Sequence, residues 1–467
     1  ENYVAMDELQ KRIAPGINLF ANPWLFQYLS ETLDRRILSV IAQRDMKGMK
    51  EAISLNLNIA TILSPGFQNF HDKAREASEK IIIEMQMIDV FSDMVGFAFA
   101  RDWLRDTTLA EAFKARGYDT ALFGKWHVQP APNLVGFDYA LFPRVHHRHT
   151  GQTFVENTGL GDVVDGFSID FEAERVNEYL AQDREDPFFM YYNISPPHMP
   201  LTDAPDKYLQ MYDPDEIPLR PNTIIDGELA YDENWFKIYL WDFLYYQEHL
   251  PHAEKLPDGF DLRHLTALYY GLTTWVDDTL GRLMANLEAH GLAENTIVVF
   301  ASDHGDNLGS HHQFNKGLLI EESIRVPLIF WGGLEPQANT AQVAQLIDIM
   351  PTLLEQCGAE VPDTVQGRAL GPILRGERET LDKNGAFIET SQGAIGLRTP
   401  DHLYGMQLEK DLRTISDDGK CLYDLNADPY ELHNLMGSAD SGLESELRQR
   451  LQTWNAQTPW LGDQNAG

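Results

Sequence analysis

A run of β-branched and aromatic residues that stops at an acid and an imidazole constrains the fold of this chain more than any other feature. Residues 296–300, Thr-Ile-Val-Val-Phe, predict a buried parallel strand. The strand is followed by Asp303 and His304, and a polar loop then continues to Lys316. Ligands of open α/β sheets bind just beyond the carboxyl ends of strands, so chemistry is expected here. The alternative interpretation is a polar turn in which Asp303 caps the next helix.

Strands and helices alternate along the chain from residue 107 onward. Strands are predicted at 118–123, 186–193, 296–300 and 325–331, and helices at 107–115, 171–180, 262–290 and from 346. This alternation is typical of an α/β fold with a large, mostly parallel mixed sheet sandwiched by helices. After residue 380 the pattern predicts short antiparallel strands and a last helix, at 386–390, 394–398, 402–408, 420–425 and 443–453. We therefore predict an α/β domain at 1–380 and a C-terminal antiparallel α+β subdomain at 381–467.

Two segments do not follow this alternation. Residues 1–105 are atypical: apolar clusters between charged residues predict amphipathic helices at 25–41 and 72–95, and 17–21 predicts a short strand. The segment 202–260 is rich in Asp, Glu, Pro, Trp and Tyr and predicts insertion loops over the sheet edge.

Composition excludes some classes of partner. The formal charge is -34, from 71 acidic and 37 basic residues, which argues against nucleic acid and anionic membranes. An anionic substrate would need local positive charge or a metal. Two cysteines, Cys357 and Cys421, exclude a disulfide framework, and we do not expect a bridge between them. No apolar run is long enough to span a bilayer and the first residues lack the pattern of a signal peptide, so we expect a soluble chain. The compartment (periplasmic, secreted or cytoplasmic) and the oligomeric state stay open.

Ionisable side chains follow three of the predicted strands. They are Lys125 and His127, then His198, then Asp303, His304 and Lys316. Because the carboxyl ends of parallel strands meet at one edge of a sheet, we predict a single site. Lysines there would stabilise developing negative charge, and histidines would protonate a leaving oxygen or orient a nucleophile. Asp303 offers a hard oxygen ligand for Ca²⁺ or Mg²⁺, with His304 beside it.

Each of these residues also has a structural interpretation. His127 could be a packed core histidine, His198 could cap a loop, and the lysines could be surface charges. His311 and His312 are further candidates for contact with substrate. The run 146–149, His-His-Arg-His, is interpreted as a solvated or substrate-facing loop, because adjacent histidines do not easily chelate one ion.

Several short motifs give the chain a family resemblance over about residues 107–457. They are Gly-Lys-Trp-His at 124–127, Pro-His-Met-Pro at 197–200, Ser-Asp-His-Gly-Asp at 302–306 with Lys316, Glu-Glu-Ser at 321–323, Arg-Val-Pro at 325–327, and the later segments 348–354, 365–370, 397–404 and 422–431. In these motifs the chain resembles a sulfatase of the alkaline-phosphatase superfamily.

The resemblance implies hydrolysis of a sulfate ester of a carbohydrate or small organic molecule. In such enzymes a formylglycine, made from Cys or Ser in a Cys/Ser-x-Pro-x-Arg motif, is the nucleophile, and a divalent ion, usually Ca²⁺ (Mg²⁺ or Mn²⁺ as alternatives), holds the sulfate. Asp303 and His304 would then be metal ligands, and Lys125 and Lys316 would hold the sulfate. His127 would support the formylglycine, and His198 would act on the leaving group.

The N-terminal part departs from the family pattern. Residues 1–100 contain no Asp-Asp pair, no cysteine and no Ser/Cys-x-Pro-x-Arg sequence, so the nucleophile is unknown. Three hypotheses follow. The chain is a sulfatase with an altered N-terminal part; it is a phosphate or phosphonate ester hydrolase of the same superfamily; or it is an inactive relative that binds anions or glycans.

Overall fold

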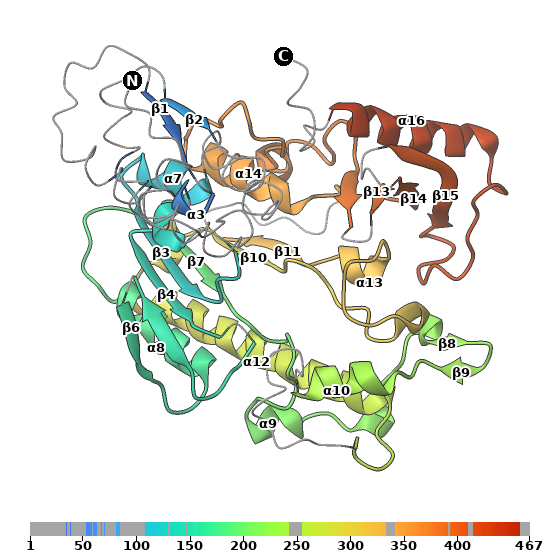
Figure 1. The fold of residues 1–467 in the computed structure, drawn as a ribbon, viewed down its shortest axis with the longest axis horizontal. Coiled ribbons are helices and arrows are strands. Elements are labelled where there is room, and N and C mark those ends of the chain that lie inside the picture. The colour runs from blue at the N-terminus through green and yellow to red at the C-terminus, as the bar shows by residue number, and fades with distance from the viewer. Residues whose placement is uncertain are drawn as a thin grey trace, which may run out of the picture. The chain divides into compact units, whose positions relative to one another are not determined.

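The computed structural model describes residues 34, 38, 53–57, 59–62, 67, 70, 81–84, 108–128, 131–145, 147–157, 159–241, 255–332, 341–390, 393–409 and 414–457 (Figure 1). The chain divides into two units, residues 1–115 with 127–139, and residues 116–126 with 140–467.

In its described residues, the first unit contains a short parallel strand pair and short helices. Strands β1 (Ile53–Asn56) and β2 (Ile81–Glu84) pair in parallel, next to helix α3 (Ile59–Ile62) in the chain. The helix predicted at 72–95 is therefore wrong at 81–84, where consecutive isoleucines favour a strand. The described positions 34 and 38 are helical, in agreement with the helix predicted at 25–41, whereas 17–21 lies outside the described residues.

Helix α7 (Leu109–Lys114) begins at a capping box, as the sequence predicts. Thr108 Oγ1 accepts from the backbone N–H of Glu111, and the Glu111 carboxylate accepts from the backbone N–H of Thr108 at 2.8 Å. The 3₁₀ helix η2 (Pro132–Leu134) follows later in this unit.

The second unit carries a five-stranded mixed sheet with strand order β6-β5-β4-β3-β7. The strands are β3 (Asp119–Gly124), β4 (Tyr139–Pro143), β5 (Thr153–Glu156), β6 (Gly159–Val163) and β7 (Phe188–Asn193). β3 and β7 run parallel with Gly124 opposite Asn193, whereas β5 pairs antiparallel with both β4 and β6. Helix α8 (Ser168–Leu180) connects β6 to β7. The two parallel strands thus end together, which brings the segments after them to one edge.

A long helix and an aromatic cluster form the largest core. Helix α12 (Leu262–Ala289) contributes Trp275, which packs with Tyr208, Phe236 and Tyr239 in one buried cluster. The elements between β7 and α12 are α9 (Asp206–Leu209), η3 (Pro214–Glu216), η4 (Pro221–Thr223), β8 (Ile224–Ile225), β9 (Glu228–Leu229) and α10 (Glu233–Trp241). The prediction of insertion loops at 202–260 is wrong for this part, because it forms helices and its residues Tyr208, Phe236 and Tyr239 are buried in the core.

The strand predicted at 296–300 has an antiparallel partner. β10 (Val298–Ala301), which follows η5 (Ala293–Asn295), pairs antiparallel with β11 (Leu328–Trp331). The pairing with β11 is antiparallel and the side chains of β10 are half-buried. The prediction of a buried parallel strand is therefore wrong for the described pairing. Between the two strands lie the loop with Asp303 and His304, η6 (Ser310–His312) and α13 (Glu321–Ile324). The chain leaves the sheet, forms the candidate site and returns beside its own strand.

Four antiparallel strands and a helix form the C-terminal part, as predicted. β12 (Ala386–Glu389), β13 (Ala394–Arg398), β14 (His402–Leu408) and β15 (Ile415–Asp424) pair in chain order, and α16 (Ser441–Gln457) follows. Leu451 of the helix packs with buried residues of the sheet, such as Leu397 and Tyr404.

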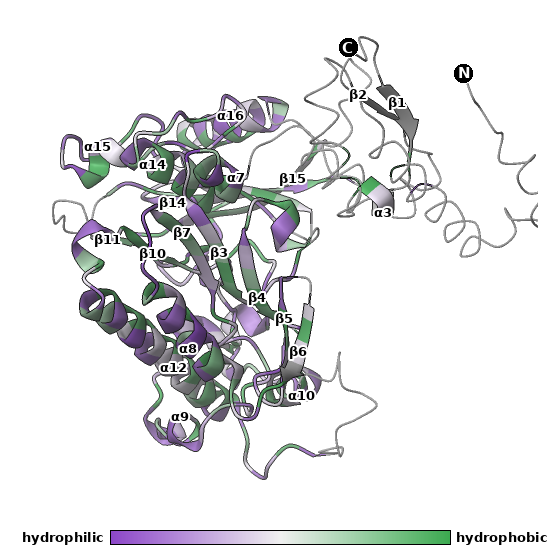
Figure 2. Cartoon of the chain, turned by 90° about the vertical axis from the view of Figure 1, so that its left-hand side faces the viewer, coloured by the Kyte–Doolittle hydropathy of each residue, from purple (hydrophilic) through white to green (hydrophobic). Residues whose placement is uncertain are grey.

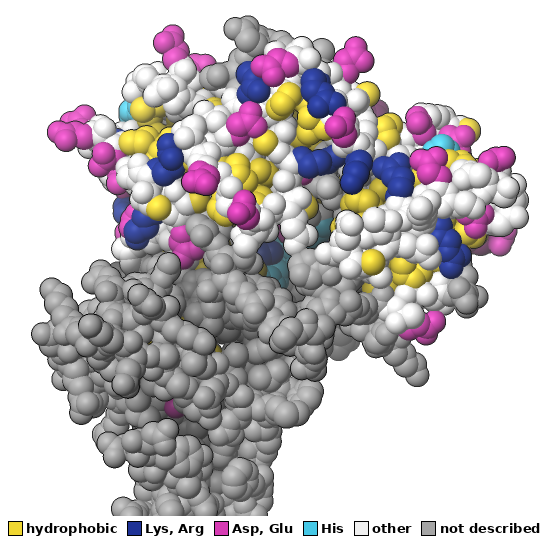
Figure 3. Space-filling model, turned by 90° about the horizontal axis from the view of Figure 1, so that it is seen from above, with side chains coloured by type: hydrophobic (Ala, Val, Ile, Leu, Met, Phe, Trp, Pro, Cys, Tyr) yellow, Lys and Arg dark blue, Asp and Glu magenta, His cyan; other side chains and the backbone are white. Residues whose placement is uncertain are grey.

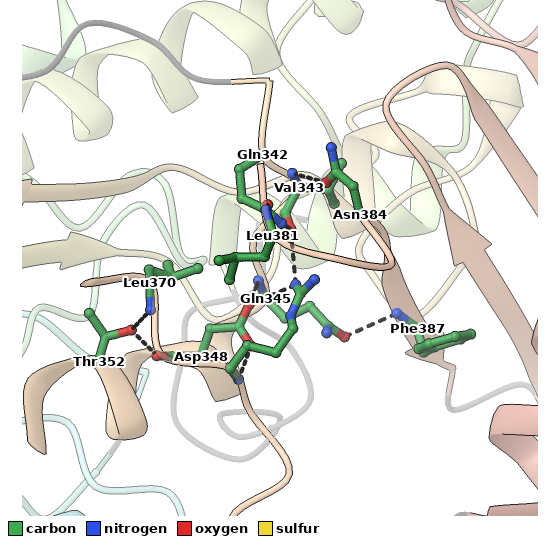
Figure 4. A network of polar contacts seen from close by, with 10 residues as sticks. Gln342, Val343, Gln345, Asp348, Thr352, Leu370, Leu381, Asn384 and Phe387 are labelled. Atoms are coloured by element: carbon green, nitrogen blue, oxygen red, sulfur yellow. Dashed lines mark hydrogen bonds and ion pairs between the residues drawn. The ribbon is translucent and has the colours of Figure 1, made fainter. Parts of the chain in front are cut away.

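A buried polar network precedes this sheet (Figure 4). It involves η7 (Leu346–Asp348), α14 (Ile349–Gln356) and the segment before α15 (Gly371–Leu374). The fully buried Asp348 accepts from the backbone N–H of Arg368 at 2.7 Å and from its guanidinium at 2.9 Å. Thr352 Oγ1 donates to the Asp348 carbonyl and accepts from the backbone N–H of Leu370. The motifs at 348–354 and 365–370 therefore hold each other in place.

Hydropathy follows these elements. Strands β3 and β7 carry mainly hydrophobic residues, and α8 and α12 carry residues of both kinds (Figure 2). On the face seen in Figure 3, acidic and basic side chains are interspersed among hydrophobic ones. Among the described residues, no helix has the length and apolar character that crossing a membrane requires. Neither Cys357 nor Cys421 forms a disulfide bond.

Candidate functional site

The end of strand β3 is built around a glycine. Gly124 has a φ of +81°, and a Cβ at this position would lie 2.2 Å from the carbonyl oxygen of Asn193. Only glycine therefore allows the two parallel strands to approach so closely. Lys125 follows at once: its backbone N–H donates to Asn193 O at 2.9 Å, and its carbonyl accepts from Asn193 Nδ2 at 2.8 Å. These two hydrogen bonds fix the backbone of Lys125 to Asn193 at the end of β7.

Beneath this strand end lies a buried carboxyl group. Glu172 of helix α8 is 1% exposed, and a Cβ on Gly124 would lie 3.2 Å from Glu172 Oε2. This Oε2 has no hydrogen-bond partner. Burial raises the pKa of Glu172 well above its ordinary value of 4.5.

The loop after β10 presents two adjacent metal-ligating side chains and a lysine. His304 Nδ1 lies 2.8 Å from Gly305 O, and since a carbonyl only accepts, Nδ1 carries the proton. The other ring nitrogen, Nε2, then has a lone pair, which accepts from Lys316 Nζ at 2.8 Å. Asp303 Oδ2 lies 3.3 Å from the same Nε2. Burial lowers the pKa of His304, and the charges of Lys316 and Lys125 lower it further.

His198 stands at the end of the segment after β7. Its Nδ1 lies 2.7 Å from Met199 O and so carries the proton in the neutral ring, and the ring stacks on His147 with 4.1 Å between centroids. Burial, and then the charge of Lys125, lower the pKa of His198 to about 3; Lys316 acts in the same direction. His198 is therefore neutral near pH 7.

Two histidines of the run at 146–149, His147 and His149, are packed rather than solvated. His147 and His149 are 4% and 0% exposed, so the prediction of a solvated loop is wrong for both. The Asp203 carboxylate accepts from the backbone N–H of His149 at 2.6 Å, and His149 Nδ1 donates to Asp203 O at 3.0 Å. Burial lowers the pKa of His149, and the charge of Lys125 contributes. The sequence showed the histidines but not Asp203, which is 54 residues away.

The charges of Lys125 and Lys316 affect the same two histidine rings, His198 and His304. Lys125 and Lys316 both lower the pKa of His198 and the pKa of His304. Such electrostatic coupling falls off steeply with distance, so these four side chains share one region. Two cations therefore lie near two neutral rings, and the role of these residues in catalysis stays a prediction.

A tyrosine supports this loop from behind. Tyr239 of α10 donates to Asp306 Oδ1 at 2.6 Å, and the backbone N–H of Asn315 donates to the tyrosine oxygen at 2.6 Å. Burial raises the pKa of Asp306 to about 6. Tyr239 therefore joins the two ends of the loop that carries His304 and Lys316.

Three candidate residues lie elsewhere or stay untested. His127 is exposed and belongs to the first unit, so its role stays a prediction. His312 Nε2 lies 3.1 Å from Glu228 O, and His311 Nε2 lies 3.9 Å from Glu431 Oε2. Contact of either residue with substrate stays a prediction too.

Comparisons with known proteins identify the family of this chain. The family model described as Sulfatase matches residues 86–359, and the model described as N-sulphoglucosamine sulphohydrolase, C-terminal, matches 309–457. The ulvan-active sulfatase of Formosa agariphila is 29% identical over 383 residues, covering 76% of this chain and 66% of that protein. The N-acetylglucosamine-6-O-sulfatase of Bacteroides thetaiotaomicron is 26% identical over 403 residues, covering 74% and 71%. A structure solved with its substrate D-glucosamine-2-N,6-O-disulfate has a TM-score of 0.64 at 24% identity, covering 75% and 82%.

The chain has an α/β fold with a mixed sheet and an antiparallel C-terminal sheet, and this fold is shared with the matched sulfatase structures. Within this fold class, the chain belongs to the sulfatase family, because the family model matches more than half of it. The family and the fold class predicted from the sequence are confirmed. The named relatives agree with the predicted reaction, hydrolysis of a sulfuric ester, and sulfatases in general use a divalent metal.

Proposed function

We propose that this chain hydrolyses the sulfate ester of a carbohydrate or small organic molecule. The observation that carries the proposal is the convergence of Lys125 and Lys316 on the neutral rings of His198 and His304. An acidic chain of formal charge -34 repels anions, so an anionic ester needs cations that are fixed locally before it binds.

The side chains take different parts in this reaction. Lys125 and Lys316 hold the sulfate oxygens and stabilise charge that develops during bond cleavage. His198 acts on the leaving-group oxygen through Nε2, since its Nδ1–H is bound to Met199 O. A bound anion offsets the lysine charges and raises the pKa of His198, which is the direction that a general acid requires. His127 is proposed to support the nucleophile.

Asp303 and His304 fit a divalent metal. His304 Nε2 and Asp303 Oδ2 lie 3.3 Å apart, and the Nδ1–H bond to Gly305 O leaves Nε2 as the ring atom with a lone pair. That lone pair accepts from Lys316 Nζ at 2.8 Å, so an ion would bind there in place of the lysine contact. These two residues would hold the ion, and we propose Ca²⁺ because the family uses it. When bound, the ion would supply a Lewis acid for a sulfate oxygen.

The formylglycine of the family does not fit residues 1–100 as they stand. They hold no cysteine and no Ser/Cys-x-Pro-x-Arg sequence, so we assign no step to that group. The nucleophile therefore stays unknown. Separately, the domain boundary at residue 380 stays a prediction.

Two relatives guide the class of substrate. One is named an ulvan-active sulfatase and another an N-acetylglucosamine-6-O-sulfatase, so we propose a sulfated glycan for this chain.

Sulfate release tests the proposal. The folded protein, supplied with Ca²⁺, is assayed with N-acetylglucosamine 6-sulfate, ulvan oligosaccharides, an aryl sulfate and an aryl phosphonate monoester. Lys125→Gln and Lys316→Gln should each lower kcat/KM by about 100-fold or more, as removal of one preorganised charge-stabilising donor does. The exposed Lys207→Gln is the matched control. Absence of sulfate release from every ester refutes hydrolysis; glycan binding without turnover would instead support the inactive relative, and faster phosphonate cleavage the phosphonate hydrolase.

A further inference from the structure

We propose that His311, Glu322 and Glu431 form a second metal site, built from residues other than Asp303 and His304, for a divalent transition metal such as Zn²⁺. One donor atom from each of the three side chains lies within 4.8 Å of the others, and among the described residues this is the group whose spacing suits an ion. The proposal does not depend on the sulfatase reaction.

The cluster is assembled from distant parts of the second unit. Glu322 lies on α13, His311 on η6, and Glu431 follows strand β15. Asn222 of η4 reaches the same place: its Nδ2 donates to Glu322 Oε1 at 2.8 Å and lies 3.3 Å from His311 Nε2. Four segments therefore direct nitrogen and oxygen atoms to one point.

Buried oxygen atoms in this cluster lack partners. Asn222 is 0% exposed and its Oδ1 has no hydrogen-bond partner; Glu322 Oε2 and Glu431 Oε1 are likewise buried and unpaired. The amide nitrogen of Asn222 lies between Glu322 and His311, so this buried side chain packs directly against the cluster. Buried polar atoms without partners are rare and costly. A bound cation would satisfy several at once.

The charges around the cluster also favour a cation. The carboxylates of Glu322 and Glu431 are 6% and 0% exposed. The guanidinium of Arg220 lies 3.8 Å from Glu322 Oε1, but its side chain is 45% exposed, so it offsets the negative charge only weakly. Glu321 adds further negative charge nearby, but its carboxylate is already paired with Arg398 at 3.1 Å.

The donor types indicate the class of metal. One imidazole nitrogen with two carboxylates is a mixed nitrogen and oxygen set. Ca²⁺ and Mg²⁺ prefer oxygen ligands alone, whereas Zn²⁺ readily binds imidazole together with carboxylate. We therefore expect Zn²⁺, or a similar ion, to bind more tightly than Ca²⁺.

A metal here would act as a cross-link. Glu431 belongs to the segment after the C-terminal sheet, whereas His311 precedes Lys316 in the candidate active-site loop. The backbone N–H of Glu321 already donates to Glu431 Oε2 at 3.1 Å, so the segments are in contact. The ion would fix the C-terminal segment to the loop that carries the sulfate-binding lysine.

Metal titration tests this site without any activity assay. An Asp303→Asn protein, in which the proposed first site is disabled, is stripped with a chelator and titrated with Zn²⁺ against a chromophoric competitor. We expect one bound Zn²⁺. Adding Glu431→Gln or His311→Ala should weaken binding by about 100-fold or more, since even outer-shell changes at metal sites cost up to about 100-fold. His312→Ala, at the adjacent histidine, should bind like the parent.

Each outcome decides the proposal. Absence of Zn²⁺ binding by the folded Asp303→Asn protein overturns it, as does equal binding by the Glu431→Gln and parent proteins, or tighter binding of Ca²⁺ than of Zn²⁺. Circular dichroism checks folding, and Glu431→Gln is isosteric, so it keeps the test valid if His311→Ala fails to fold.

Discussion

Replacing Glu172 with glutamine should stabilise the protein at neutral and alkaline pH and leave its stability unchanged near pH 4. Glu172 is buried behind the end of strand β3, its Oε2 has no partner, and burial raises its pKa well above 4.5. The native protein therefore holds a proton that the unfolded chain releases at its ordinary pKa. Glutamine has the same shape as the protonated acid and does not titrate.

The size of the effect follows from proton linkage. Because the native pKa is raised, the stabilising contribution of Glu172 is complete below pH 4.5 and is lost as pH rises toward the native pKa. The loss is about 1.4 kcal/mol of unfolding free energy per pH unit in that window. Glu172→Gln abolishes this loss. The difference in unfolding free energy between the variant and the wild type should therefore grow by about 1.4 kcal/mol per pH unit in the same window.

Urea unfolding between pH 4 and 8.5 measures this difference. The control is Glu174→Gln, which lies exposed on the same helix and should follow the wild type at every pH. If the difference between Glu172→Gln and wild type does not change with pH, Glu172 is ionised in the native protein and the reasoning is refuted.

Four further predictions address the network and the site. Asp348→Asn should lower the unfolding free energy by about 3 kcal/mol, because it breaks a buried ion pair; an unchanged urea midpoint would contradict this. Lys125→Gln should raise the pKa of His198 above about 3, because the lysine charge, after burial, is the next cause of the depression; histidine NMR titration measures it. Gly305→Ala should reduce stability and activity, because its Cβ would meet a carbonyl oxygen of α13 at 1.9 Å, whereas Gly281→Ala has open space and should be tolerated. Chelation should lower Tm, and added divalent metal should restore it; an unchanged Tm would count against a bound metal.

Local signals in the sequence predicted the elements and the strand ends well. The motif at 124–127 could be recognised from the sequence because the close approach of strand β7 requires a glycine at position 124. Lys125, the next residue, then lies at the strand end. The capping box of α7 and the long amphipathic helix at 262–290 are likewise set by neighbours in the chain. These features depend on short-range geometry, which a single sequence contains.

Partners that are distant in the chain could not be predicted. The pairing of His149 with Asp203 joins residues 54 apart, and the bond between Asn222 and Glu322 joins residues 100 apart. Strand β10 resembled a buried parallel strand because its composition does not specify its neighbour, and its pairing with β11 depends on the path of the intervening loop.

The motifs of the family do not all bear on catalysis. Asp348 and Arg368 stabilise the segment before the C-terminal sheet, and Glu321 pairs with Arg398 of strand β13 (Figure 4 shows the first network). These contacts hold whatever nucleophile the chain uses, so the later motifs carry the fold. The proposal of sulfate hydrolysis rests instead on the side chains at the strand ends, where two lysine charges meet two neutral imidazoles. An N-terminal part that departs from the family pattern is therefore compatible with the sulfatase fold, and the sulfate-release assay decides whether the chain hydrolyses sulfate esters.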